Sequence, residues 1–255
     1  MIKFKFYFVF ALLFPVASYA CSCAHYGVVH NFQQSEFVAK AKIIKITPDP
    51  KNSDYHDAVI KIISLYKGEH LDKIKIMSSL NSSCGFLPEE SSTWIIFAGR
   101  LQGMLSFGFC SGGIDIGRTF DSAEYPNANR NYGNTIKLKE GVISFLCQNK
   151  IPNPNPFELH AFNTKISLLK GYKNKNSFAV FQVDVNSDFS IADIKQLKKF
   201  ENGKLNKLVN DSMKTELTFV GKRGQPFAKP TKVILFCFFY QNEGSNQSFL
   251  SFIDV

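Results

Sequence analysis

The sequence lacks the short motifs that mark three large classes of enzyme. It contains no glycine-rich phosphate-binding loop, no His-Glu-x-x-His zinc-protease signature and no Gly-x-Ser-x-Gly nucleophile turn. We therefore expect a protein that is not an enzyme and that carries no cofactor of its own. Lysine is spread along the chain without a polybasic tract, so the formal net charge of +9 does not predict nucleic-acid binding.

Long hydrophobic runs are equally scarce, and the longest lies at the start of the chain. Two lysines precede an apolar run of nine residues, 6–14, which Pro15 ends. That length is about half of the roughly 20 residues that cross a bilayer as a helix. Together with the small residues Ser18 and Ala20, it predicts a cleaved signal peptide at residues 1–20 and no membrane anchor after cleavage.

Cleavage there would make Cys21 the first of 255 − 20 = 235 mature residues. The alternative is a lipoprotein, because bacterial lipoproteins are acylated on a cysteine at this position and acylation caps its α-amine. Ser18 and Tyr19 fit the residues preceding such a cysteine poorly, so ordinary cleavage is favoured. We expect an exported protein, periplasmic or secreted, of a bacterial envelope.

All six cysteines follow the leader: Cys21, Cys23, Cys84, Cys110, Cys147 and Cys237. An even number of cysteines in an exported chain favours disulfide bonds. A zinc cluster is the alternative, but the spacings are long and no pair of histidines is placed to complete it.

Five β-rich segments bounded by turn residues follow the first two cysteines. They are residues 37–46, 58–66, 73–77, 94–98 and 105–109. Lys67-Gly68 is expected to turn the chain after the second segment, and Gly99-Arg100 after the fourth. Short strands at this spacing predict a small five-stranded barrel of the OB type over residues 21–116.

These residues resemble the amino-terminal inhibitory domain of the tissue inhibitors of metalloproteinases, a netrin-like OB module. Cys21-Ser22-Cys23 resembles the family's opening Cys-Thr-Cys, and Tyr66-Lys67-Gly68 resembles the turn after its second strand. Ser83-Cys84-Gly85 is similar to its central Cys-Gly. Residues 32–42 and 94–99 are similar to its first and fourth strands, and all these matches follow the family's order.

The resemblance implies two disulfide bonds, Cys21–Cys84 and Cys23–Cys110, which tie the amino terminus to the barrel. Four cysteines allow three pairings, so spacing alone does not choose among them. In this family the amine nitrogen and carbonyl oxygen of the first residue bind the catalytic zinc of a metalloproteinase. The resemblance therefore implies that Cys21 binds a zinc ion held by another protein.

The same resemblance assigns the neighbouring residues to protease binding. Ser22 is expected to point into the primary specificity pocket of the protease, while Ser82 and Ser83 form a ridge with Cys21 and Ser22. Cys23 is counted with these four as a protease-binding residue. The expected partner is a zinc metalloproteinase. Catalytic zinc keeps one open coordination position, normally filled by water, which a rigid chelate can take.

The second half of the chain predicts a separate α+β domain. Residues 117–136 are polar and contain Pro126, which predicts a linker. Helices are expected at residues 137–150 and 204–214, and strands at 177–185, 189–200, 216–220 and 232–240. This order in residues 137–255 resembles the TonB carboxy-terminal domain, which implies a small αβ sandwich with an antiparallel sheet.

Two points remain open from the sequence. Cys147 and Cys237 can form a third disulfide bond, or they can be two buried free thiols. The whole chain can also be read as a cell-envelope interaction protein without inhibitory activity, whose second domain contacts an envelope protein through its strand edges.

Overall fold

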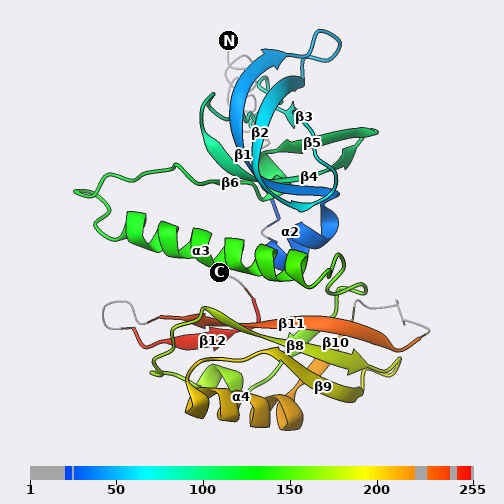
Figure 1. The fold of residues 1–255 in the computed structure, drawn as a ribbon, viewed down its shortest axis with the longest axis vertical. Helices are drawn as coiled ribbons and strands as arrows, with labels where there is room; N and C mark the ends of the chain where they lie inside the picture. The colour runs from blue at the N-terminus through cyan, green and yellow to red at the C-terminus, as the bar shows by residue number, and fades with distance from the viewer. Residues whose placement is uncertain (1–20, 25, 222–228, 242–245, 254–255) are drawn as a thin grey trace, which may run out of the picture.

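The computed structural model describes residues 21–24, 26–221, 229–241 and 246–253. The predicted signal peptide, residues 1–20, lies outside the described residues. In Figure 1 the chain forms layers: a barrel at the top, the helix α3 (Ala128–Gln148) beneath it, then a sheet, and the helix α4 (Gly203–Glu216) at the bottom.

The first part of the chain is a closed five-stranded barrel. Its strands are β1 (Phe37–Pro48), β2 (Tyr55–Lys67), β3 (Lys73–Met77), β4 (Thr93–Leu101) and β5 (Met104–Gly108). The strands pair in the order β1-β2-β3-β5-β4, and an antiparallel pairing of β1 with β4 closes the barrel. The β3–β5 pairing is parallel. This is the order of an OB-like barrel, so the predicted fold class is confirmed.

Alternation along β1 explains why this segment forms a barrel strand. Phe37, Ala39 and Ala41 are buried inside the barrel, where they meet the apolar side chains of the other four strands. Val38, between them, points outward into the layer that contains α3. Because successive side chains of a strand face opposite sides, one strand can supply two apolar cores.

Several boundaries differ from those expected from the sequence. β4 continues to Leu101 instead of turning at Gly99-Arg100, and the turn falls at Gln102 and Gly103, whose φ angles are 51° and 80°. The short helix α2 (Val28–Gln34) and the two-residue strand β6 (Ile114–Asp115) are not predicted by the sequence pattern. Both elements are too short to show a clear periodicity.

Helix α3 begins inside the segment predicted to be a linker, residues 117–136. Tertiary contacts support its polar first turns. The Tyr132 hydroxyl donates a hydrogen bond to the Asp115 carbonyl, and its ring packs edge-on against Phe120 at 5.5 Å between centroids. Asn129 bonds both the amide and the carbonyl of Phe120, each at 2.8 Å. These contacts offset the weak helix propensity of the Asn-rich sequence.

The second part of the chain is built on an antiparallel sheet with the order β12-β11-β8-β9. Its strands are β8 (Phe178–Val185), β9 (Ile191–Lys198), β11 (Thr231–Tyr240) and β12 (Phe249–Ser251). A smaller pair, β7 (His160–Phe162) and β10 (Thr218–Val220), lies beside it. The expected helix-containing antiparallel sheet is therefore confirmed.

Each face of this sheet is covered by a helix, so β8 and β11 bury side chains on both faces. This explains why the sequences of these two strands are nearly continuously apolar. Phe178 and Val180 of β8 point toward α3, whereas Ala179 and Phe181 point toward α4. The α3 side joins the barrel and the sheet in one apolar cluster. Its buried members are Val28, Phe32, Val38, Ile95, Phe97, Ile114, Ile136, Leu138, Val142, Ile143, Leu146, Phe178, Val180, Phe236 and Phe238.

Polar contacts also cross between the barrel and the rest of the chain. Glu140 of α3 forms an ion pair with Lys40 at 3.0 Å and accepts a hydrogen bond from the Tyr66 hydroxyl at 2.9 Å. Lys67 Nζ donates to the carbonyls of Phe32 and Pro152, at 2.8 and 3.3 Å. Desolvation lowers the pKa of Lys67. These contacts fix the orientation of the barrel on α3.

In the described part of the chain, no helix combines the length and apolar character that spanning a bilayer requires.

Replacing Gly68 by alanine should destabilise the fold more than the same change at Gly103. Both residues have positive φ, +88° and +80°, so both changes carry the backbone cost of about 1 kcal/mol. At Gly68 the new Cβ would also lie 2.6 Å from the Glu36 carbonyl oxygen, whereas nothing lies within 4 Å at Gly103. Urea unfolding should give a loss of about 3 kcal/mol for Gly68→Ala. Equal losses for the two variants would contradict the close approach.

Tyr66 should make stability fall at alkaline pH. Burial, followed by the hydrogen bond to Glu140, raises the pKa of Tyr66 from 10.0 to about 12. Its contribution to stability is therefore fully present below pH 10 and is lost as pH rises toward 12, because the unfolded chain ionises first. In denaturant unfolding between pH 8 and pH 11.5, the wild type should lose more stability than Tyr66→Phe. Parallel pH curves would contradict this assignment.

Candidate functional site

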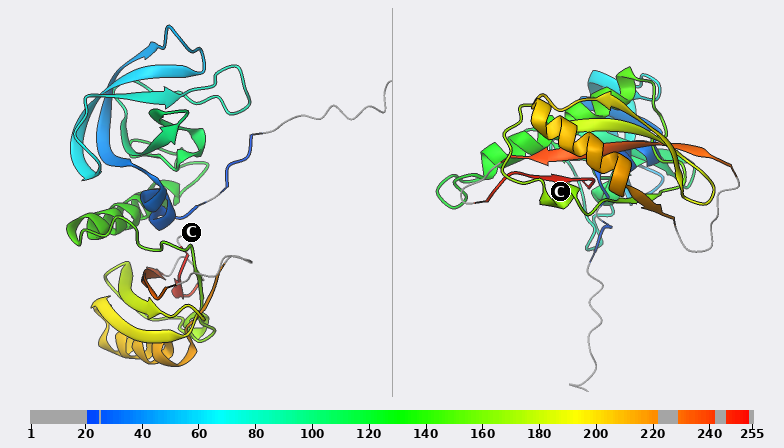
Figure 2. Two further views of the ribbon diagram at one scale, coloured as in Figure 1. Left: turned by 90° about the vertical axis from the view of Figure 1, so that its right-hand side faces the viewer. Right: turned by 90° about the horizontal axis from the view of Figure 1, so that it is seen from below.

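The first described residues are bonded covalently to the barrel. Cys21 is joined to Cys84 and Cys23 to Cys110, with Cα–Cα distances of 5.1 and 5.2 Å. This is the pairing that the family resemblance implied. In Figure 2 (left) the amino-terminal segment descends beside the barrel toward α2. Each bridge closes a loop long enough to contribute about 4 kcal/mol in the chain-entropy account of disulfides.

The two bridges are adjacent to each other. The sulfur atoms of Cys21, Cys23 and Cys110 all lie within 4.8 Å of one another. Such a cluster resembles a metal site in its spacing, but each of these sulfurs is committed to a disulfide bond and offers no thiolate. The disulfide interpretation is therefore confirmed over the alternative of a zinc cluster at these residues.

The predicted ridge residues are presented at the surface around the first bridge. Ser22 is exposed between the half-buried Cys21 and Cys23, and Ser82 and Ser83 are exposed just before Cys84. The Cys21–Cys84 bond brings these two stretches together. The structure thus joins all five residues expected from the sequence in one region of the surface.

Local hydrogen bonds hold the loop that carries Cys84. The Ser82 hydroxyl donates to the Ser79 carbonyl at 2.8 Å and accepts from the Cys84 amide at 3.1 Å. The Phe86 amide donates to the Ser78 carbonyl at 2.8 Å and closes the loop. Ser79 has a φ of 40°, in the left-handed region that few non-glycine residues adopt. The loop is therefore a defined turn, and its geometry sets the position of Cys84.

Large apolar side chains are exposed on the same bridged segments. Leu80 and Leu87 flank Cys84 in sequence and are 51% and 42% exposed, and Phe109 precedes Cys110 and is 51% exposed. Tyr26, which follows the first two cysteines, is also 54% exposed, but it stacks on His30 of α2 at 4.2 Å between ring centroids and so lies apart from this group. Exposed apolar residues gathered around one feature are typical of protein-contact surfaces. The sequence did not predict this group, because Leu80, Leu87 and Phe109 lie on separate segments that the β3–β5 pairing and the disulfide bonds bring together.

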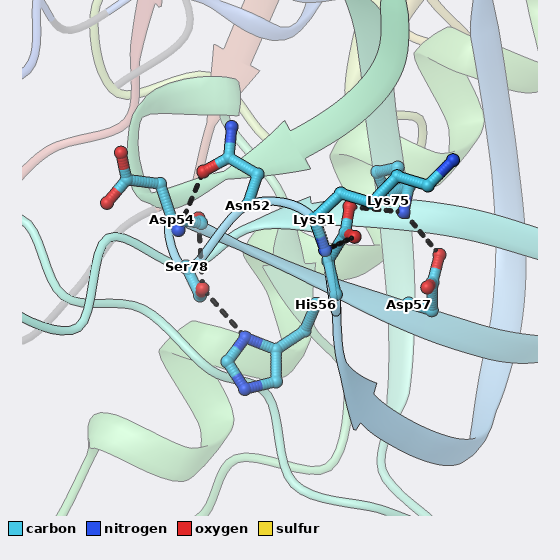
Figure 3. A network of polar contacts seen from close by, with 8 residues as sticks. Lys51, Asn52, Asp54, His56, Asp57, Lys75 and Ser78 are labelled. Atoms are coloured by element: carbon cyan, nitrogen blue, oxygen red, sulfur yellow. Dashed lines mark hydrogen bonds and ion pairs between the residues drawn. The ribbon is translucent and has the colours of Figure 1, made fainter.

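Sequence reasoning also missed two buried polar residues at the base of the Cys84 loop, His56 of β2 and Ser78 just after β3. Figure 3 shows the ring of His56 directed at the Ser78 hydroxyl, and Nδ1 lies 2.8 Å from Oγ. They are 22 residues apart and match no motif, so no signal in the sequence pointed to them.

A separate cavity of about 660 Å³ lies between α2 and the second sheet. His30 and Gln33 of α2 line one side, and Ile234 and Phe236 of β11 line the other. Among its described lining residues there is no member of the predicted ridge. The predicted ridge therefore lies outside this cavity.

Cys147 and Cys237 are free thiols in the structure, so the alternative of a third disulfide bond is wrong. The reason is strand alternation. Phe236 and Phe238 of β11 face α3, whereas Cys237 between them faces the core on the α4 side. The sheet itself separates Cys237 from the helix that carries Cys147. Only Cys237 is fully buried, while Cys147 is half-buried, and burial raises the pKa of the Cys237 thiol.

Neither a scan against protein-family models nor a search of curated proteins gives a match to this chain. The class is therefore defined by the structure: an OB-like barrel with disulfide-bonded amino-terminal cysteines, followed by helix-containing antiparallel sheets. The two disulfide bonds indicate an oxidising, extracytoplasmic location.

Thiol labelling should distinguish the two free cysteines. Without reductant, a maleimide should modify Cys147 in the native protein and should reach Cys237 only after denaturation, because Cys237 has no solvent exposure. Intact mass spectrometry should then count one label on the native chain and two on the denatured chain. The variants Cys147→Ser and Cys237→Ala identify which thiol reacts. Two native labels would contradict the burial of Cys237.

Proposed function

We propose that the mature protein is an exported inhibitor of a zinc metalloproteinase, with Cys21 as the residue that binds the protease zinc. The observation that carries this proposal is the pairing of Cys21 with Cys84 and of Cys23 with Cys110, which leaves Ser22 exposed between them. That arrangement fits the family resemblance of the opening Cys21-Ser22-Cys23, since it holds the proposed first residue on a rigid barrel.

The chemistry of a free Cys21 suits an open zinc position. Its α-amine nitrogen and carbonyl oxygen can close a five-membered chelate ring with the metal and displace the bound water. The amine must be neutral to coordinate, and α-amines lose their proton near pH 7.7–8.0, so this costs little at neutral pH. Because the bridges already order the segment, little conformational entropy remains to be lost on binding.

The residues around Cys21 define what the inhibitor would present to the protease. Ser22 is the exposed side chain nearest to the chelating residue in sequence, and we assign it to the primary specificity pocket. Ser82 and Ser83 lie across the first bridge and add to the ridge. Leu80 and Phe109 supply apolar contact area at its margin. Because the side chain of Ser22 is small and polar, we expect the target protease to have a small primary specificity pocket.

The setting for this activity is the periplasm or the exterior of a bacterial cell. The proposed partner holds the zinc, so the inhibitor itself is not an enzyme and needs no resident cofactor. The second, sheet-containing part of the chain is proposed to contact an envelope protein, and nucleic acid is not proposed as a partner. The proposed location and the proposed envelope partner both follow from the predicted leader and from the disulfide-bonded amino terminus.

An added amino-terminal alanine before Cys21 should reduce inhibition at least 100-fold. The extra residue converts the α-amine into an amide, which cannot coordinate zinc as a neutral amine does, and it also crowds the metal. Inhibition constants against a panel of zinc proteases provide the measurement. A matched control carries the extra alanine after Val255 and should inhibit like the wild type. If both forms inhibit equally, the chelation mechanism is rejected.

A second candidate function is an envelope interaction protein without a protease partner. The observation that favours it is the sheet order β12-β11-β8-β9, which leaves the outer edge of β9 without a strand partner among the described residues. Such edges can accept an extended segment of another protein. A stable partner that co-purifies from envelope extracts, with no inhibition of any zinc protease tested, would favour this function over the first.

A further inference from the structure

The base of the Cys84 loop contains a buried hydrogen-bonded pair that belongs to no apolar core. Ser78 has no solvent exposure, and His56 is 9% exposed. Polar groups buried in this way are destabilising unless they are bonded, and their bonds are then specific in direction. Figure 3 shows the pair beside the turn that contains Asn52 and Asp54.

The bonds around Ser78 fix which atom donates to which. The Asp54 carbonyl accepts from the amides of Ser78 and Ser79 at 2.8 and 3.0 Å, and from the Ser78 hydroxyl at 3.0 Å. Since that hydroxyl has one hydrogen and donates it to Asp54, its oxygen accepts the hydrogen on His56 Nδ1. His56 is therefore assigned the Nδ1–H form.

This direction excludes a nucleophile–base role for the pair. A serine nucleophile needs to donate its hydrogen to the histidine, and its oxygen needs access to a substrate. Here the Ser78 hydrogen points to a backbone carbonyl, and Ser78 is fully buried. The pair is suited instead to holding the two segments together.

The turn on the other side of the pair is itself held in place. The Asp54 amide donates to the Asn52 side-chain oxygen at 3.0 Å, and the Tyr55 amide donates to the Asn52 carbonyl at 3.0 Å. Lys75 of β3 forms ion pairs with Asp49 at 2.6 Å and with Asp57 at 2.7 Å, and so ties β3 to the hairpin of β1 and β2. Figure 3 shows the pair with Asp57. The Asp54 carbonyl is thus a fixed anchor point for Ser78.

We propose that His56 and Ser78 are positioning residues for the Cys84 loop and, through the Cys21–Cys84 bridge, for the amino terminus of the mature protein. The path is short: Ser78 begins the loop, its carbonyl accepts the Phe86 amide that closes it, and Cys84 lies between them. The consequence for zinc binding rests on the proposed inhibitory function, whereas the positioning of the bridge does not.

The test compares the two disulfide bonds within one molecule. The purified mature chain, His56→Leu, Ser78→Ala and His56→Asn are treated with dithiothreitol, quenched by alkylation and mapped by peptide mass spectrometry. In His56→Leu and Ser78→Ala, the initial rate of reduction of Cys21–Cys84 should rise about tenfold, the factor expected when a buried hydrogen bond of about 1.4 kcal/mol is lost. The initial rate at Cys23–Cys110 should stay within about twofold of the wild-type rate, since Cys110 lies in a different segment, the turn after β5 in which the Ser111 hydroxyl accepts from the Gly108 amide.

His56→Asn is the conservative variant, because its side-chain amide nitrogen can replace Nδ1 as the donor to Ser78. It should restore the slow reduction of Cys21–Cys84. Unchanged rates in His56→Leu and Ser78→Ala overturn the proposal, as does equal acceleration of both bonds, which indicates general destabilisation. Ser78→Ala removes a single oxygen and keeps the test available if His56→Leu does not fold.

A parallel inhibition assay separates this inference from the proposed function. If wild-type protein inhibits a zinc protease, His56→Leu should weaken inhibition about tenfold and His56→Asn should restore it. If the wild type inhibits none, the inhibitor proposal fails, while the selective acceleration at Cys21–Cys84 still supports the positioning role. Selective acceleration without any change in inhibition overturns the link from the bridge to the zinc-binding residue.

Discussion

Two covalent bonds give the amino-terminal segment its position. Residues 21–24 contain no helix or strand, so backbone pairing does not hold them against the barrel. The bonds from Cys21 and Cys23 do so instead, and they end at two separate places, the loop between β3 and β4 and the short turn after β5. Because Cys21 and Cys23 are only two residues apart and are bonded to different parts of the barrel, the two bonds restrict both the position and the direction of the segment. The proposed binding of zinc by the Cys21 amine and carbonyl would depend on this restriction, because both atoms must be held in one orientation.

The barrel can hold this segment because its own anchor points are rigid. Cys84 belongs to a loop closed by backbone and serine hydrogen bonds, and Cys110 lies in a short 3-10 turn in which the Ser111 hydroxyl accepts from the Gly108 amide at 2.8 Å. The barrel in turn packs on α3 through a large apolar cluster and the contacts of Glu140 and Lys67. The apolar cluster therefore holds the barrel in place, and the hydrogen bonds of the two loops hold the cysteines to which the exposed ridge is bonded.

Much of the fold could be predicted from the sequence, because strand alternation is a local signal. Ala39 to Ile43 alternate clearly between apolar residues and lysines, and the barrel strands and α4 lie near their predicted positions, whereas α3 begins nine residues before its predicted start. The bridge pairing was expected only from the resemblance, since spacing permits three pairings. Non-local effects explain the misses: Tyr132 and Phe120 support an Asn-rich helix start, and His56 and Ser78 meet across 22 residues. The free state of Cys237 follows from which face of β11 it occupies, a relation that requires the packing of α3.

The apolar layer around α3 has a consequence for dissecting the chain. Val28, Phe32 and Phe97 on the barrel side are covered by the same helix that covers Phe178 and Phe236 on the sheet side. A fragment ending before α3 would expose the first group to water, and a fragment beginning after it would expose the second. Burial of such side chains is worth roughly 2 kcal/mol each, so neither half is autonomous without the helix. Any minimal version of this protein that is engineered for binding must therefore carry α3 along with the barrel.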